Sequence, residues 1–172
     1  MLAITADTGV FFSIMLKAMH AKRILEVGTS TGFSTLWFAN AIMSVAGNPS
    51  IITIEADPAK IRRAKKNFVQ ARADSIIEIK QGVAVDVLRQ MKKKNDFDFV
   101  FIDADKENML EYFDLVLPMT KVGGIIAADN MLFPEHYRPH MDKYARYVRR
   151  RQNVQSVTVP VGMGEEVTLK LS

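Results

Sequence analysis

RILEVGTSTGFS, residues 23–34, is the stretch that decides the fold. It starts with a short apolar run typical of a buried strand and continues with two glycines four positions apart. Glycine allows the tight turn and the close backbone approach that a strand-to-helix loop needs. The helix after such a loop presents unpaired N–H groups, which bind anions. The stretch therefore predicts a strand, a ligand-binding loop and a helix.

Outward from this stretch, apolar runs of strand length alternate with helical patterns along the chain. Such alternation predicts a Rossmann-like α/β fold with a doubly wound, mostly parallel sheet and helices on both faces. The last two strands have no helix between them, so we expect an antiparallel hairpin. The expected strands are residues 23–27, 51–55, 76–80, 97–102, 125–128, 154–161 and 167–171. The expected helices are residues 31–45, 84–93, 110–117 and 138–152, with another that begins at Pro58, and a turn is expected at residues 122–124.

Composition agrees with one globular domain over residues 1–172, in which residues 1–22 form a short N-terminal helix. No apolar run approaches the ~20 residues that cross a bilayer, and the N-terminus lacks the basic leader and cleavage site of a signal peptide. The absence of cysteine excludes disulfides, a thiol nucleophile and cysteine-ligated zinc. We therefore expect a cytoplasmic protein without membrane partners. We interpret the net charge of +4 as a solvated basic surface.

In open α/β sheets ligands bind beyond the carboxyl ends of the strands, so the residues that follow each strand are the candidates. After the first strand, the spacing E-x-G-x-x-x-G from Glu26 suits an amino-acid carboxylate better than the pyrophosphate of a nicotinamide cofactor. After the second, Glu55 is placed to accept both hydroxyls of a ribose. After the third, Gly82, Val83 and Ala84 let an adenine edge lie against the backbone. These features predict an adenosine-containing ligand, either a nucleotide cofactor or S-adenosylmethionine.

Polar residues also follow the fourth and fifth strands. Asp103 ends one strand, and Asp129 and Asn130 end the other. Two carboxylates and an amide oxygen on adjacent strand ends form a hard oxygen site that suits Mg²⁺ or Ca²⁺, although each aspartate alone could cap a helix. Lys106 stands beside this site and is either a general base or a solvated charge.

Four segments resemble the caffeoyl-CoA and catechol O-methyltransferase family, whose members use S-adenosylmethionine and a divalent metal. They are ILEVGTSTGFSTLWFA, TIEADP, FDFVFIDADKENMLEYFDLVLP and VGGIIAADNMLF, in the family's order. Together, the loops and the resemblance imply that S-adenosylmethionine contacts Glu26, Gly28, Thr29, Ser30, Gly32, Ser34, Glu55, Ala56, Gly82, Val83, Ala84 and Asp103. The resemblance further implies that the metal is held by Asp103, Asp129 and Asn130 and that Lys106 is the catalytic lysine.

The resemblance also implies the chemistry and the partners. The metal would chelate two vicinal oxygens of a catechol-like small molecule and lower the pKa of one hydroxyl; Lys106 would take that proton, and the oxygen would attack the methyl group in line. The chain differs from the family pattern in a shorter N-terminal region, in its adenine turn and in the loop after the fifth strand. A homodimer is expected, and the apolar residues that would cover the sheet or form the interface are Phe11, Phe12, Ile14 and Met15.

GTSTG, residues 28–32, also fits the G-x-S-x-G nucleophile elbow of α/β-hydrolases, with Ser30 as the nucleophile. Asp103 or Asp129, and then His136 or His140, follow in the required order. We favour the methyltransferase because only one strand precedes the loop and no HGGG-like oxyanion segment is present.

Three other hypotheses stand beside that of a small-molecule methyltransferase: a histidine metal site, RNA binding, and cofactor binding without turnover. His136 and His140 share one face if helical, but Pro139 between them indicates a loop or a helix start, so we prefer surface histidines to metal ligands. The arginine run at residues 149–151 could bind RNA, but no aromatic platform accompanies it and we prefer a solvated helix face. A protein that binds S-adenosylmethionine without turnover is the third hypothesis.

Overall fold

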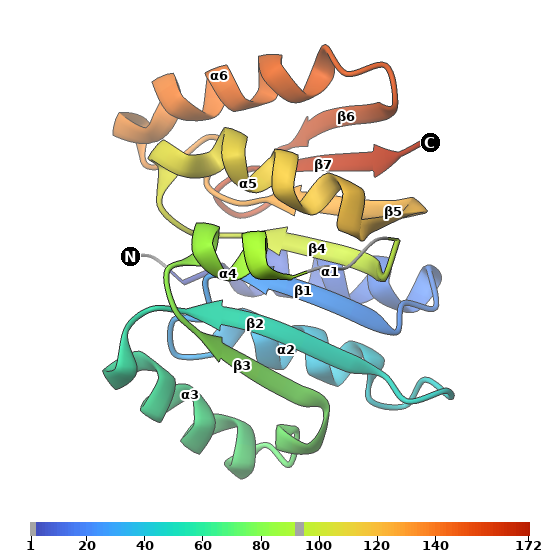
Figure 1. The fold of residues 1–172 in the computed structure, drawn as a ribbon, viewed down its shortest axis with the longest axis vertical. Coiled ribbons are helices and arrows are strands. Elements are labelled where there is room, and N and C mark those ends of the chain that lie inside the picture. The colour runs from blue at the N-terminus through green and yellow to red at the C-terminus, as the bar shows by residue number, and fades with distance from the viewer. Residues whose placement is uncertain (1–2, 92–94) are drawn as a thin grey trace.

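The computed structural model describes residues 3–91 and 95–172, and it places a seven-stranded sheet between two layers of helices (Figure 1). The strands are β1 (Arg23–Val27), β2 (Ser50–Glu55), β3 (Ile77–Gln81), β4 (Phe97–Ile102), β5 (Thr120–Ala128), β6 (Val154–Val159) and β7 (Glu165–Lys170). Their order is β3-β2-β1-β4-β5-β7-β6, with β1 to β5 parallel and β7 antiparallel to both of its neighbours. The predicted Rossmann-like fold with a terminal antiparallel hairpin is confirmed.

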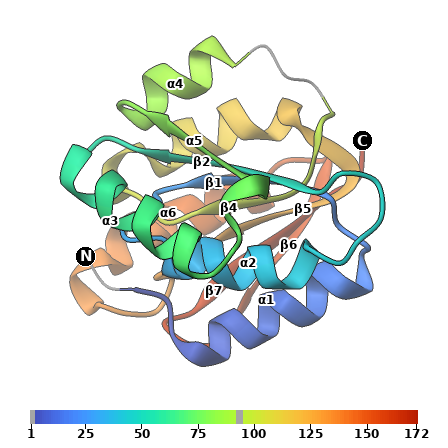
Figure 2. The same cartoon turned by 90° about the horizontal axis from the view of Figure 1, so that it is seen from below.

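The helices cover the two faces of the sheet in sets of three (Figure 2). One face carries α1 (Ala6–Ala18), α2 (Phe33–Ile42) and α3 (Pro58–Gln70). The other carries α4 (Ala84–Gln90), α5 (Met109–Val116) and α6 (Arg138–Arg149). None of these described helices combines the length and the apolar character that a membrane crossing requires.

Two apolar cores result, because the central strands are buried on both faces. From Phe99 to Ile102 successive residues of β4 face opposite cores, and Phe99 and Phe101 lie on the side of α1 and α2. The ring of Phe12 in α1 lies 5.3 Å from that of Phe99 and 5.5 Å from that of Phe101. Phe12 therefore covers the sheet, which is one of the two roles considered for it, whereas Ile14 in the same helix is 64% exposed.

The strand order reverses at β1, which pairs with β2 on one side and with β4 on the other. Ligands of open α/β sheets bind at such a reversal, beyond the carboxyl ends of the strands. Gly28 follows β1 and Asp103 follows β4, so both lie at this point. The carboxyl ends of the parallel strands lie on the left in Figure 1, on the same side as the N-terminal segment.

Several predicted boundaries differ from the structure. The turn predicted at residues 122–124 is wrong, because these residues belong to β5. Phe97 pairs with Thr120 and Phe99 with Ile125, so four residues of β5 stand opposite one residue of β4 and form a bulge. Helix α2 begins at Phe33, later than predicted, because its N-cap Gly32 has a left-handed φ of +88°. The predicted continuation of α4 through residues 92 and 93 lies outside the described residues.

Candidate functional site

Glu55, at the end of β2, joins the glycine loop to the start of α3. Its Oε2 accepts a hydrogen bond of 2.8 Å from the backbone N–H of Ser30. Its Oε1 accepts hydrogen bonds from the backbone N–H groups of Ala56, at 2.9 Å, and Asp57, at 3.0 Å. Three N–H donors hold an ionised carboxylate firmly. Glu55 thus lies where a ribose acceptor is expected, and its contact with a ribose remains a prediction.

Gly28 lets the glycine loop pass directly over the end of β4. Its φ is +104°, and a Cβ at this position would lie 2.0 Å from the backbone oxygen of Asp103. No side chain can be accommodated at that distance, so only glycine allows the two strand ends to meet. Gly28 and Asp103 together line two cavities in this part of the structure.

The larger of these two cavities has a volume of about 220 Å³ and lies between the ends of β2, β3 and β4. Seven residues predicted to bind the cofactor line it, namely Gly28, Glu55, Ala56, Gly82, Val83, Ala84 and Asp103. Tyr112 and Asp105 also line it, and the Tyr112 hydroxyl donates a hydrogen bond of 2.5 Å to Asp105. The sequence analysis missed this pair, although the seven-residue spacing places a helical aromatic over a strand-end carboxylate.

The smaller cavity, of about 20 Å³, lies on the other side of the glycine loop. Thr29, Ser30 and Ser34 line it from the loop and the start of α2. Ala3 and Ile4 line it from the N-terminal segment, and Ile4 is buried. The N-terminal segment therefore forms a wall of the site, which no feature of the sequence indicated.

Glu26 lies beneath the glycine loop and lines neither cavity. It is fully buried, and its carboxylate accepts hydrogen bonds from the hydroxyls of Ser34 and Thr35, at 2.5 Å each, and of Thr53, at 2.6 Å. Burial raises the pKa of Glu26 to about 7, and the three hydroxyl donors oppose this rise. The structure thus gives Glu26 a supporting position under the loop.

Lys106 is buried between the ends of β4 and β5. Its Nζ donates to Oδ1 of Asp103 at 3.3 Å and to the backbone oxygen of Asp129 at 3.4 Å. It also lies 5.7 Å from the centre of the Tyr137 ring. The predicted catalytic lysine and the two predicted metal-binding aspartates are therefore brought together.

Asp129 and Asn130 follow β5 in a constrained backbone. Oδ1 of Asp129 accepts a hydrogen bond of 2.6 Å from the N–H of Asn130, whose φ is +67°. The side-chain nitrogen of Asn130 donates to Sδ of Met163 at 3.4 Å, so the amide oxygen is not used in that contact. Burial, together with the neighbouring charge of Asp103, raises the pKa of Asp129 to about 6. Within residues 3–91 and 95–172, no cluster of three or more His, Cys, Asp or Glu side chains suits a metal ion.

Glu165, the first residue of β7, is a buried member of this group that the sequence analysis missed. It is 0% exposed, and its Oε1 accepts a hydrogen bond of 3.2 Å from the hydroxyl of Thr8 in α1. Its Oε2 is buried and has no hydrogen-bond partner within the described residues. Burial raises the pKa of Glu165, and the charge of Asp129 raises it further. The available signal was a glutamate at a position of the hairpin strand that faces the core.

The loop between β5 and α6 is bound to the turn of the C-terminal hairpin. The N–H of Met131 donates to the Gly164 oxygen at 2.9 Å, and those of Leu132 and Phe133 donate to the Met163 oxygen at 2.9 and 3.1 Å. Leu132 is 37% exposed and Phe133 is 56% exposed. The loop after the predicted metal-binding residues thus offers apolar surface next to Asn130.

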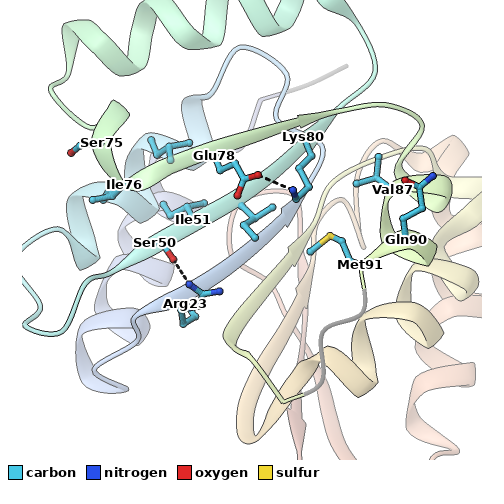
Figure 3. Close-up of a pocket in the computed structure, with 12 residues that line it drawn as sticks. Arg23, Ser50, Ile51, Ser75, Ile76, Glu78, Lys80, Val87, Gln90 and Met91 are labelled. Carbon is cyan, nitrogen blue, oxygen red and sulfur yellow. Dashed lines mark hydrogen bonds and ion pairs between the residues drawn. The ribbon is translucent and has the colours of Figure 1, made fainter.

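A larger cavity, of about 690 Å³, lies away from the strand carboxyl ends, between α4 and the face of β2 and β3 (Figure 3). Arg23 donates a hydrogen bond of 2.8 Å to Ser50 there, and Lys80 pairs with Glu78 at 2.7 Å. None of the predicted site residues lines this cavity. Volume alone therefore does not mark the functional site.

The alternative functions gain no support from side-chain geometry. Among the described residues, no histidine is hydrogen-bonded to Ser30, and His136 packs against the Tyr137 ring instead, with 4.3 Å between ring centres. In the arginine run, Arg149 is bound to Glu166 at 2.7 Å and Arg151 to Asp114 at 2.6 Å. The run is therefore partly neutralised by carboxylates and is not a uniformly free basic face.

Comparison with known proteins gives a consistent result. The sequence model of the O-methyltransferase family matches residues 1–168. A catechol O-methyltransferase of Niastella koreensis is 37% identical over 133 residues, which cover 76% of this chain and 59% of that protein. A caffeoyl-CoA O-methyltransferase of Medicago sativa is 34% identical over 153 residues, which cover 84% of this chain and 61% of that protein. The chain thus spans about three fifths of the length of these curated relatives.

Solved structures resemble the whole of this fold. An O-methyltransferase from Bacillus cereus in complex with SAH has a TM-score of 0.87 at 26% identity, covering 98% of this chain and 82% of that one. An O-methyltransferase from Streptomyces achromogenes in complex with SAM has a TM-score of 0.89 at 25% identity, covering 99% of this chain and 82% of that one.

Proposed function

Because the chain belongs to the O-methyltransferase family, we propose that it transfers the methyl group of S-adenosylmethionine to an oxygen of a small aromatic molecule with vicinal hydroxyls, with help from a divalent cation. One observation carries this proposal: Lys106 contacts Asp103, which itself lines both cavities beside the glycine loop. The candidate base, the candidate oxygen site and the cavities beside the glycine loop therefore share Asp103.

The residues around the glycine loop fit S-adenosylmethionine. The adenosine part of S-adenosylmethionine suits the cavity of about 220 Å³ at Glu55. Its methionine part suits the other side of the glycine loop, where the N–H groups at the start of α2 can bind the methionine carboxylate. Solved relatives of the same fold contain SAH and SAM. The cofactor supplies a methyl group on a positively charged sulfur, which the acceptor oxygen takes as the carbon–sulfur bond breaks.

The donor chemistry at the ends of β4 and β5 fits Mg²⁺ or Ca²⁺. Asp103 and Asp129 lie close enough for the charge of Asp103 to raise the pKa of Asp129, and the amine of Lys106 contacts both residues. A divalent cation would offset the remaining negative charge, with the oxygen of Asn130 as a third donor. When bound, such an ion chelates vicinal oxygens and lowers the pKa of a hydroxyl. Two carboxylates and one amide leave coordination positions for the acceptor and water.

The chain's own residues would do the rest. Lys106 accepts the proton of the acceptor hydroxyl at Nζ, and its contacts with Asp103 and Asp129 fix the position of that atom. Tyr137 covers the amine on one side and excludes water there. Leu132 and Phe133 offer apolar surface against an aromatic ring. Since Arg149 and Arg151 are held by carboxylates, we favour a small acceptor over nucleic acid and also expect a homodimer.

The test is calorimetric titration with S-adenosylhomocysteine, followed by Mg²⁺ and a catechol in the same cell. We expect cofactor binding in the wild type and in Asp129→Ala, with catechol binding that requires the metal and is lost in the variant. Asp142→Ala, an exposed aspartate on α6, is the matched control and should behave as the wild type. Absence of S-adenosylhomocysteine binding by the wild type would contradict the central proposal.

A further inference from the structure

Thr53 is a polar residue in the middle of an apolar strand. Its neighbours along β2 are Ile52 and Ile54, and Thr53 itself is 0% exposed. A valine of nearly the same shape would fill this position without burying a hydroxyl, and a buried hydroxyl costs free energy unless it is hydrogen-bonded. The hydrogen bonds of the Thr53 hydroxyl therefore indicate what it does.

The Thr53 hydroxyl lies between Glu26 and the glycine loop. Thr53 is the partner of Glu26 in the parallel pairing of β1 with β2, and its Oγ1 donates to Oε2 of Glu26 at 2.6 Å. Oγ1 of Thr29, in the loop, lies 2.6 Å from the same hydroxyl oxygen. A hydroxyl carries one hydrogen, and that of Thr53 is given to Glu26, so Thr29 is the donor to Thr53. The three side chains thus form one chain of hydrogen bonds that runs from the loop to the buried carboxylate.

This chain of hydrogen bonds is enclosed by the protein. Thr29 is 1% exposed, and Thr53 and Glu26 are 0% exposed. The other two donors to Glu26 are the hydroxyls of Ser34 and Thr35 at the start of α2. Glu26 therefore ties the loop, through Thr53, to the helix that follows the loop.

The backbone of the glycine loop explains why an anchor is needed. Gly28, Ser30 and Gly32 have positive φ values, of +104°, +49° and +88°. A residue other than glycine in this region of φ is strained and stays there only when its surroundings hold it. The N–H of Ser30 is held by Glu55 at 2.8 Å. The side chain of Thr29 supplies a second attachment, on the buried side of the loop.

We infer that Thr53 is a positioning residue that holds the glycine loop, through Thr29, in the form that binds the methionine end of S-adenosylmethionine. This inference rests on the proposed function, in which the loop binds that cofactor. Thr29 and Ser30 line the cavity on that side of the loop, whereas Thr53 lines neither cavity beside the loop and acts from beneath it. Loss of the Thr53 hydroxyl leaves the buried Thr29 hydroxyl without its acceptor and lets the loop populate other forms, which lowers the apparent affinity for the ligand.

The experiment measures S-adenosylhomocysteine affinity by calorimetry and the free energy of unfolding by urea on the same samples. T53V keeps the shape of the side chain and removes the hydroxyl, whereas T53S keeps the hydroxyl and removes the methyl group. T29V removes the hydroxyl at the loop end, and the double variant T53V/T29V tests whether the two hydroxyls act together. T168V is the matched control, because Thr168 is also a 0% exposed threonine of the sheet, with its hydroxyl 2.7 Å from that of Ser156.

We expect T53V and T29V each to weaken S-adenosylhomocysteine binding about 3- to 30-fold, the range that loss of one hydrogen bond covers. The double variant should bind no more than about twofold more weakly than the weaker single variant, because both substitutions break the same chain. T53S should bind within about threefold of the wild type, although loss of a buried methyl group lowers its stability. T168V should lose stability and keep its affinity within about twofold, because Thr168 shares no partner with the loop. T29V carries the test if T53V does not fold.

Four results would overturn the inference while the wild type still binds S-adenosylhomocysteine. Wild-type affinity in both T53V and T29V would show that the hydroxyls do not hold the loop. Equal weakening in T53S and T53V would assign the effect to packing, and an equal loss in T168V would assign it to general destabilisation. Additive losses in the double variant would show that Thr29 and Thr53 act separately. A wild type that does not bind S-adenosylhomocysteine would instead contradict the proposed function, and this inference with it.

Discussion

The backbone oxygen of Asp103 stands 2.0 Å from the point that a Cβ of Gly28 would occupy. We predict that Gly28→Ala weakens S-adenosylhomocysteine binding at least about tenfold, and lowers the free energy of unfolding by about 1–3 kcal/mol, because it adds a clash to an unfavourable φ. Calorimetry and urea unfolding measure the two effects. Gly123→Ala is the control, since Gly123 also has a positive φ, of +79°, but no atom lies within 4 Å of its Cβ position. Equal losses in both variants would assign the effect to backbone strain alone.

Both carboxylate oxygens of Glu55 should be needed as hydrogen-bond acceptors. Its carboxylate accepts hydrogen bonds from three backbone N–H groups, one of which belongs to Ser30 in the glycine loop. Glu55→Gln replaces one acceptor oxygen with a donor, and a lost bond to a charged group is worth about 1.5–3 kcal/mol. We expect S-adenosylhomocysteine to bind about 10- to 100-fold more weakly in calorimetry. An unchanged affinity in Glu55→Gln would remove Glu55 from the cofactor site, and Glu78→Gln on the exposed side of β3 serves as the control.

Stability should fall as the pH rises through neutrality because of Glu26. The pKa of this buried group is raised from 4.5 to about 7, so the folded state holds the proton more tightly than the unfolded state. The stabilising contribution of Glu26 to the free energy of unfolding is fully present below pH 4.5 and is lost as the pH rises through 7. The glutamine in Glu26→Gln cannot ionise. Between pH 5 and pH 8 the free energy of unfolding of the variant should therefore rise by up to about 3 kcal/mol relative to that of the wild type. Urea unfolding at several pH values measures this, and parallel curves for the two proteins would contradict it.

Lys106 should affect turnover more than binding. Lys106→Met keeps most of the apolar stem and removes the amine that contacts Asp103 and Asp129. We expect methyl transfer to a catechol to fall about 10²- to 10⁴-fold, the usual range for loss of a general base, with S-adenosylhomocysteine affinity within about threefold. Rate measurements under saturating cofactor, with Lys143→Met on the exposed side of α6 as the control, test this. A variant with the wild-type rate would exclude Lys106 as the base.

Strand positions were the best predicted part of the structure, and the reason is burial. The bounds of β1 and β4 agree with the prediction, because apolar runs flanked by charge leave little choice of register. Residues 122–124 were misassigned since Gly123 and Gly124 suggest a turn, whereas the tertiary context uses them for a bulge inside β5. Local signals cannot distinguish a turn from a bulge, because both call for glycine.

The site was predictable in its strand-end residues and not in its supporting residues. Asp103 and Lys106 follow strands directly, so the fold class alone places them at one edge of the sheet. Glu165 comes from the far end of the chain, and its hydrogen bond with Thr8 joins two elements that are distant in sequence. Such a link depends on how the hairpin and α1 pack, which no sequence spacing reports.

The N-terminal segment and Ser172 lie at opposite ends of the strands. Ala3 borders the glycine-loop cavity at the carboxyl edge, while the chain leaves through Ser172 at the other edge (Figure 1). Attachment of this chain to a sensor surface or a solid support through Ser172 should therefore keep the glycine-loop cavity directed at the solution. A tether on the segment that contains Ala3 would lie beside that cavity, so the point of attachment decides how freely a ligand reaches it.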